Sequence, residues 1–186
     1  MRSLSHQAKG DYDKALELFE KARAIREKTL GEEHPDTATT YNNMAGVYNE
    51  QGDYDKALEL HEKALTIREK TLGKEHPDTA ATYNNMAIVY DEQGNYDKAL
   101  ELYEKAKVIR EKTLGKEHPD TATTYYNLAL LYEDQKDYGK AINLFLSAHA
   151  IFKNKLGDQH PYTIKAKEGI QRIIDIDPGL SRSAGV

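Results

Sequence analysis

The sequence contains no cysteine and few residues that interrupt helices. Without thiols the chain can form no disulfide, thiolate metal site or cysteine nucleophile, and it suits a reducing compartment. Gly contributes 12 and Pro only 5 of the 186 residues, whereas 31% of the residues are charged. This composition is typical of a helix-rich chain, and its hydrophobic content of 39% is low for one compact core.

A basic excess and a long apolar run are also missing. The 26 Lys and Arg residues are outnumbered by 31 Asp and Glu residues, which gives a formal net charge of −5. Because binding to phosphates requires a basic excess, nucleic acid is not an expected partner. The opening MRSLSHQAKGDYDK lacks the apolar core of a signal peptide, and no run reaches the roughly 18 apolar residues of a membrane span. We therefore expect a cytoplasmic protein without a membrane partner.

The chain contains an internal repeat with a period of 42 residues. The segment GDYDKALEL begins at Gly10 and again at Gly52, and a copy with one change begins at Gly94. A divergent fourth copy, KDYGKAINL, begins at Lys136 on the same spacing. The corner motif HPDT, which becomes HPYT in the last copy, follows the same period at His34, His76, His118 and His160. Since no insertion interrupts the copies, each unit is expected to fold alike and to stack on the next, as in a solenoid.

Each repeat is predicted to hold two amphipathic helices, of which the second is longer. Residues of the first helix spaced i, i+3, i+4 and i+7 form one packing face, as at Tyr41, Met44, Ala45 and Tyr48. Prolines suit the first helical position, at Pro35, Pro77, Pro119 and Pro161. Glycines suit the left-handed end of the second helix, at Gly31, Gly73, Gly115 and Gly157.

The repeat resembles the tetratricopeptide repeat. In the first full copy the signature positions hold Tyr41, Met44, Ala45, Tyr48, Ala57, His61 and Ala64. The unit is longer than the usual length of about 34 residues because the second helix continues through IREKTLG. With YNNMA in the first helix, it resembles the kinesin light chain type of repeat. The resemblance implies an all-α, right-handed superhelical solenoid of antiparallel helix pairs that binds other proteins.

The period also predicts how the chain is divided, and it indicates a fragment of a larger protein. The expected parts are a partly disordered remnant of a preceding helix (1–9), a second helix without its first (10–34), three repeats (35–76, 77–118 and 119–160), a C-terminal capping helix (161–177) and a disordered tail (178–186).

The seven histidines are not expected to bind a metal or to catalyse a reaction. The four corner histidines belong to successive units roughly 10 Å apart, whereas metal ligands must converge on one point. His61 takes the position of Phe19, Tyr103 and Phe145 in the other copies and is therefore interpreted as a core residue. No nucleophile and base pair, phosphate cradle or carboxylate dyad stands out from the repeat. We therefore expect no enzymatic activity and no cofactor.

The face of the first helices opposite the packing face is the candidate binding surface. In tetratricopeptide folds this face lines the concave groove, an expectation that the resemblance supplies. In the first repeat it holds Thr39, Asn42, Asn43, Gly46, Asn49 and Glu50. The candidate groove residues are Asn42, Asn43, Asn84, Asn85, Ile88, Glu92, Tyr126, Asn127, Leu130 and Asp134. Amide side chains donate and accept hydrogen bonds, so a row of them can pair with the backbone of an extended peptide. The alternative is that the asparagines persist from repeat duplication or pair with neighbouring helices.

One edge of this surface, which runs from Asn49 to Asp134, is acidic. By charge complementarity, this edge predicts a peptide that carries Lys or Arg near an apolar anchor. This departs from the kinesin light chain pattern, in which basic groove residues accept acidic cargo motifs. Arg26, Arg68 and Arg110 on the packing face of the second helices could accept an acidic peptide, but a structural role is favoured.

The favoured function is thus a kinesin light chain-like adaptor, and two other functions remain open. The chain could be a structural or sensor arm of a larger, nucleotide-switched regulatory protein. It could also self-associate through the helix at Asp11–Leu30, which exposes Tyr12, Ala15, Leu16 and Phe19 if no preceding helix covers it.

Overall fold

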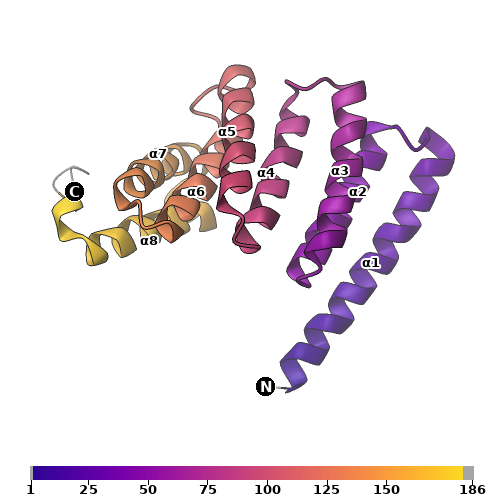
Figure 1. The fold of residues 1–186 in the computed structure, drawn as a ribbon, viewed down its shortest axis with the longest axis horizontal. Coiled ribbons are helices and arrows are strands. Elements are labelled where there is room, and N and C mark those ends of the chain that lie inside the picture. The colour runs from indigo at the N-terminus through magenta and orange to yellow at the C-terminus, as the bar shows by residue number, and fades with distance from the viewer. Residues whose placement is uncertain (1, 182–186) are drawn as a thin grey trace. The chain divides into compact units, whose positions relative to one another are not determined.

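Residues 2–181 are described by the computed structural model of the chain, with side chains from Asp11 to Ser181. This part of the chain forms eight α-helices and one 3-10 helix and holds no β-strand (Figure 1). The elements are α1 (Arg2–Leu30), α2 (Pro35–Glu50), α3 (Tyr54–Thr71), α4 (Pro77–Glu92), α5 (Tyr96–Thr113), α6 (Pro119–Asp134), α7 (Tyr138–Leu156), α8 (Pro161–Ile176) and η1 (Pro178–Ser181). The predicted all-α class is confirmed. The predictions for Met1 and for residues 182–186 concern positions outside the described range.

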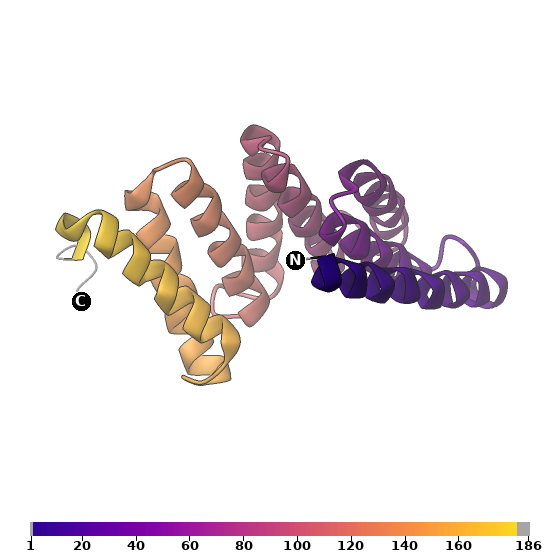
Figure 2. The ribbon, with the colours of Figure 1, turned by 90° about the horizontal axis from the view of Figure 1, so that it is seen from below.

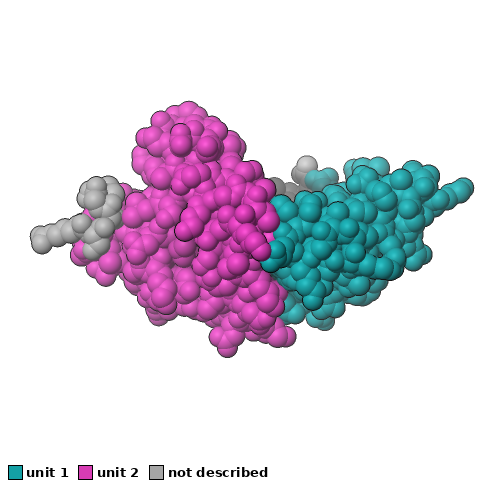
Figure 3. All heavy atoms as spheres, turned by 90° about the horizontal axis from the view of Figure 1, so that it is seen from above, with its two compact units in different colours: residues 1–93 teal, residues 94–186 magenta. Residues whose placement is uncertain are grey.

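The helices form two compact units, Met1–Gln93 and Gly94–Val186, which are coloured separately in Figure 3. In the first unit, α1 packs on α2, α2 on α3 and α3 on α4, and α2 also contacts α4. In the second unit, α5 packs on α6, α6 on α7 and α7 on α8; Figure 2 shows α8 in yellow beside α7 in orange. Each unit is therefore a stack of helix pairs. None of the helices within residues 2–181 has both the length and the apolar character needed to cross a bilayer.

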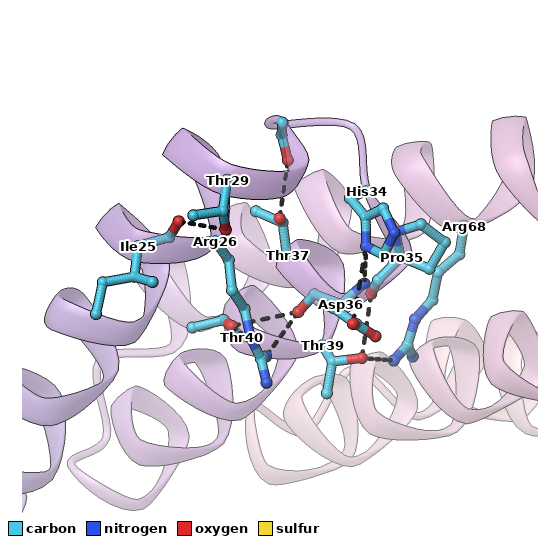
Figure 4. Close-up of polar contacts among 11 residues, drawn as sticks. Ile25, Arg26, Thr29, His34, Pro35, Asp36, Thr37, Thr39, Thr40 and Arg68 are labelled. Carbon is cyan, nitrogen blue, oxygen red and sulfur yellow. Dashed lines mark hydrogen bonds and ion pairs between the residues drawn. The ribbon is translucent and has the colours of Figure 1, made fainter.

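The corner motif caps the helices on both sides of each turn (Figure 4). His34 precedes α2, and its Nδ1 accepts a hydrogen bond from the backbone N–H of Asp36 at 3.1 Å. Thr37 donates its hydroxyl to the carbonyl of Gly31 at 2.9 Å, and Gly31 has a φ of +97°. The same bonds recur in the corners that begin at His76, His118 and His160. The structural role predicted for the corner histidines is confirmed.

In the first three copies, an arginine of the second helix bonds to the first helix that follows it. Arg68 Nη1 donates to the carbonyl of Asp78 and to the hydroxyl of Thr82, both at 2.8 Å. The equivalent bonds join Arg26 to Asp36 and Thr40, as Figure 4 shows, and Arg110 to Asp120 and Thr124. Burial lowers the pKa of the Arg68 and Arg110 side chains. Because these two guanidinium groups are buried and bonded to a neighbouring helix, they are not placed to accept a peptide from solution.

The fourth copy replaces this polar link with two aromatic rings. Phe152 takes the position of Arg110, and Tyr162 takes the position of Asp120. The two rings stack with their centroids 5.4 Å apart. A Cβ added to Gly169 would lie 2.7 Å from the Phe145 ring, so the missing side chain lets α8 lie close to α7. The helix α8 is therefore packed into the core of the second unit.

The structure differs from the predicted division at both ends. One continuous helix, α1, begins at Arg2, whereas the sequence suggested a separate remnant over 1–9 and a new helix at 10. A single glycine within a helix costs only about 1 kcal/mol, so Gly10 does not end it. Residues 178–181 form η1 and are not part of a disordered tail, because Leu180 packs against the cluster around Ile173.

Candidate peptide-binding surface

All six predicted groove residues of the first unit lie on α2 and α4, which contact each other. Asn43 on α2 is exposed, and Glu92 at the end of α4 is also exposed. Asn85 and Ile88 on α4 are half-buried. The structure thus places amide, apolar and acidic side chains on two neighbouring helices, as the repeat predicted.

A cavity of about 200 Å³ opens between α2, α3 and α4. Its lining residues are Gly46, Asn49, Glu50, His61, Asn85, Ile88 and Val89. Two of them, Asn85 and Ile88, are predicted groove residues. Three more, Gly46, Asn49 and Glu50, belong to the predicted face of the first repeat. The structure therefore brings this part of the predicted surface together around one hollow.

Two departures from the repeat line this cavity. Gly46 takes the position that Ile88 and Leu130 occupy in the later copies. A Cβ added at Gly46 would meet no heavy atom of the described residues within 4 Å outside its own helix. His61 lines the other side, where the later copies have Tyr103 and Phe145. A missing side chain and a smaller ring leave room beside Ile88.

His61 is a neutral, buried part of the cavity wall. Its side chain is only 2% exposed, and its Nδ1 lies 2.8 Å from Oδ1 of Asn42. Burial, helped by the positive charge of Arg68, lowers the pKa of His61 from 6.5 to about 4. With the Asn42 oxygen accepting, Nδ1 donates and Nε2 keeps its lone pair. The interpretation of His61 as a core residue is confirmed. The side-chain oxygen of Asn42 is already hydrogen-bonded to His61.

Asn84 differs from the prediction in the way it is placed, whereas Asn49 lies on the predicted surface. Asn84 is only 3% exposed, so its side chain offers almost no surface to a ligand. Its position on α4 turns it toward the interior, which a period of 42 residues alone does not reveal. Asn49 lines the cavity, and its Oδ1 is buried without a hydrogen-bond partner in the described part of the chain.

In the second unit, the predicted residues on α6 are partly built into the core. Tyr126 is half-buried and meets Phe145 edge-on, with ring centroids 5.6 Å apart, and burial raises the pKa of Tyr126. Leu130 packs against the cluster that contains Phe145, while Asn127 is half-buried and Asp134 is exposed. Tyr126 and Leu130, which were predicted as groove residues, therefore also contribute to the packing of the second unit.

Two larger hollows lie away from the predicted residues. One of about 650 Å³ lies between α1 and α3 and contains the glutamates Glu27, Glu32, Glu33, Glu59 and Glu62. Three of these already have partners: Tyr41 donates to Glu27, Lys70 pairs with Glu33 and Lys63 pairs with Glu59. The other, of about 660 Å³, lies between α7 and α8. Among residues 11–181, no group of three or more His, Asp or Glu side chains is arranged to hold a metal ion.

Comparison with solved structures supports the architecture. BtubC (BKLC) from P. vanneervenii is similar over 96% of this chain and 71% of its own, with 26% identity and a TM-score of 0.79. A putative kinesin light chain of Podosopora anserina with nearly identical TPR-like repeats is 31% identical, with a TM-score of 0.71. That match covers 97% of this chain and 85% of the other. The predicted solenoid of antiparallel helix pairs is confirmed.

Sequence comparison identifies the family. The Arabidopsis thaliana protein KINESIN LIGHT CHAIN-RELATED 2 is 49% identical over 37 residues, a match that covers 20% of this chain and only 6% of that relative's length. The family model described as Tetratricopeptide repeat matches residues 2–70, 36–107 and 91–154. The chain therefore belongs to the tetratricopeptide repeat family, with repeats of the kinesin light chain type.

Proposed function

We propose that the surface formed by α2 and α4 binds an extended segment of another protein, and that the chain acts as a non-enzymatic adaptor. The observation that carries this proposal is the cavity between α2, α3 and α4, because predicted groove residues line it. Family membership supports a protein-interaction role, and the kinesin light chain likeness supports a cytoplasmic location.

The chemistry of this surface suits a backbone ligand with a basic side chain. Asn43 and Asn85 can each donate to and accept from the peptide groups of an extended segment. Glu50 and Glu92 are exposed carboxylates at the last positions of α2 and α4, where the helix dipoles add partial negative charge. Both features favour a segment that carries Lys or Arg.

The role of the amides is tested with the double variant Asn43→Ala and Asn85→Ala. Peptides selected from a random library on the wild-type chain should bind the double variant about thirtyfold more weakly, since two neutral hydrogen bonds of about 1 kcal/mol each contribute about 2 kcal/mol. The melting temperature should stay the same, because neither side chain belongs to the core. Asn143→Ala, at an exposed position of α7, is the matched control. Equal affinity of the double variant and the control would remove the amides from the mechanism.

Self-association through α1 is the second candidate function. Leu18 and Ile25 lie seven residues apart on one side of α1 and are 66% and 63% exposed. Apolar side chains grouped in this way mark interaction sites on many proteins. Light scattering over a dilution series should show dimers that Leu18→Glu abolishes. A monomer at every concentration would rule out self-association through α1.

A structural or sensor arm of a larger protein is compatible with the same fold.

A further inference from the structure

We propose that the cavity beside Gly46 is a specificity pocket that receives the side chain of a lysine or arginine from the bound segment. The inference rests on the proposed function and adds to it the chemistry and the position of the anchor. Four observations carry it: the space, the apolar walls, the acceptor groups and the absence of the feature in the later repeats.

The first observation is the size of the pocket. A cavity of about 150 Å³ is large enough to hold benzene. The pocket beside Gly46, with about 200 Å³, can therefore receive one long side chain but not a folded element. The space is open because position 46 has no side chain, and nothing in the described residues outside the helix itself approaches within 4 Å of its missing Cβ.

The second observation is that the walls suit an aliphatic stem. Ile88 and Val89 contribute apolar surface from α4, and Val89 is otherwise buried in the core. Lys and Arg side chains lay their methylene groups on such surface while the charged head reaches polar atoms or water. A short polar side chain would leave these walls uncovered.

The third observation is that the polar lining offers acceptors and no cation. Glu50 is a carboxylate, neutral His61 keeps a lone pair on Nε2, and the amides of Asn49 and Asn85 can accept as well as donate. Among the described residues, no lysine or arginine lines the pocket. An ammonium or guanidinium group has only donors and so complements this set, whereas a carboxylate would face Glu50 without a cation.

The fourth observation is that the later copies of the repeat fill the same position. Ile88 and Leu130 provide at their positions the side chain that Gly46 lacks. The equivalents of His61 are the larger rings of Tyr103 and Phe145. The chain thus contains its own examples of the filled state, and these indicate which substitution closes the pocket without disturbing the helix.

The decisive variant is Gly46→Leu, which copies Leu130. The new side chain enters open space, and replacing a helical glycine also removes its conformational cost, so the variant should fold at least as well. Gly139→Leu is the matched control, because this helical glycine of α7 lies outside the pocket and has only Asp137 Oδ1 near its missing Cβ, at 4.0 Å. Circular dichroism melts establish that both variants are folded.

The probe is a set of peptide pools with random flanks and one fixed central residue: Lys, Arg, norleucine, Leu or Glu. Norleucine keeps an aliphatic stem like that of lysine without the charge. The wild-type chain should prefer the Lys and Arg pools over norleucine by at least about tenfold, which corresponds to about 1.4 kcal/mol. Gly46→Leu should abolish this preference, Gly139→Leu should keep it, and Glu50→Gln should reduce it.

The outcomes separate this inference from the proposed function. If the wild-type chain binds none of the pools, the peptide-binding function itself fails, and the pocket with it. If it binds Lys and Arg peptides that Gly46→Leu binds equally well, the pocket is wrong while the function stands. A preference for norleucine or Leu over Lys would overturn the basic anchor in favour of an apolar one, and a preference for Glu would overturn it outright.

Discussion

Lys136 has a left-handed backbone with a φ of +62°, at the position where the earlier copies have Gly52 and Gly94. A residue with a Cβ pays roughly 1 kcal/mol in this region, whereas glycine adopts it freely. We predict that Lys136→Gly raises the free energy of unfolding by about 1 kcal/mol in urea titrations. Gln135→Gly, with an ordinary φ of −75°, is the control and should give no gain. Equal effects of both substitutions would contradict this explanation.

His61 should make stability depend on pH. Its pKa is about 4 in the folded chain and near 6.5 when unfolded, so between these values the unfolded state binds more protons. The contribution of neutral His61 to the free energy of unfolding is therefore fully present above pH 6.5. It is lost as the pH falls toward 4, and the loss is on the order of 3 kcal/mol. His61→Phe, which copies Phe145, should remove this loss. Unfolding of both proteins at several pH values checks it, and parallel curves would show that His61 does not titrate as described.

Between neighbouring helices, the arginine links should contribute measurably where they are buried. Arg110→Met keeps an aliphatic stem but removes the bonds to the carbonyl of Asp120 and the hydroxyl of Thr124. We expect a loss of about 2 kcal/mol in the free energy of unfolding, because the carbonyl of Asp120 and the hydroxyl of Thr124 each lose a hydrogen bond from a buried, charged donor. Arg26→Met removes the equivalent bonds at a half-exposed site, where water can replace them, and should cost about 1 kcal/mol. Denaturant titrations compare the two, and a larger loss for Arg26→Met would contradict the role of burial.

The helices and their ends were predictable because short-range rules determine them. The period of 42 residues, the prolines and the glycines depend on local sequence alone, and the structure follows them from α2 onward. The partners of the arginines were not predicted, although a signal exists. Each of these arginines precedes an aspartate by 10 residues and a threonine by 14. Where Phe152 replaces the arginine, Tyr162 replaces the aspartate, so the two positions change together.

For the molecule as a whole, the repeat predicted which helix faces carry the candidate residues. It did not predict how deeply each of these side chains is buried. The stripe of positions that includes Asn43, Asn85 and Ile88 follows from helix geometry. The burial of Asn84 and the bond between Asn42 and His61 depend on how α2, α3 and α4 pack, which the period does not specify. The cavity arises from departures from the repeat, and a search for such departures would have pointed to Gly46.

Binding of a peptide on the α2 and α4 surface of the first unit can be observed by amide chemical-shift mapping, in which the isotope-labelled chain is titrated with the tightest peptide from the library. The largest changes should occur at Gly46, Asn49, Asn85 and Ile88, and Gly46→Leu should diminish them. Changes centred on the acidic hollow between α1 and α3, or on the hollow between α7 and α8, would contradict binding on this surface.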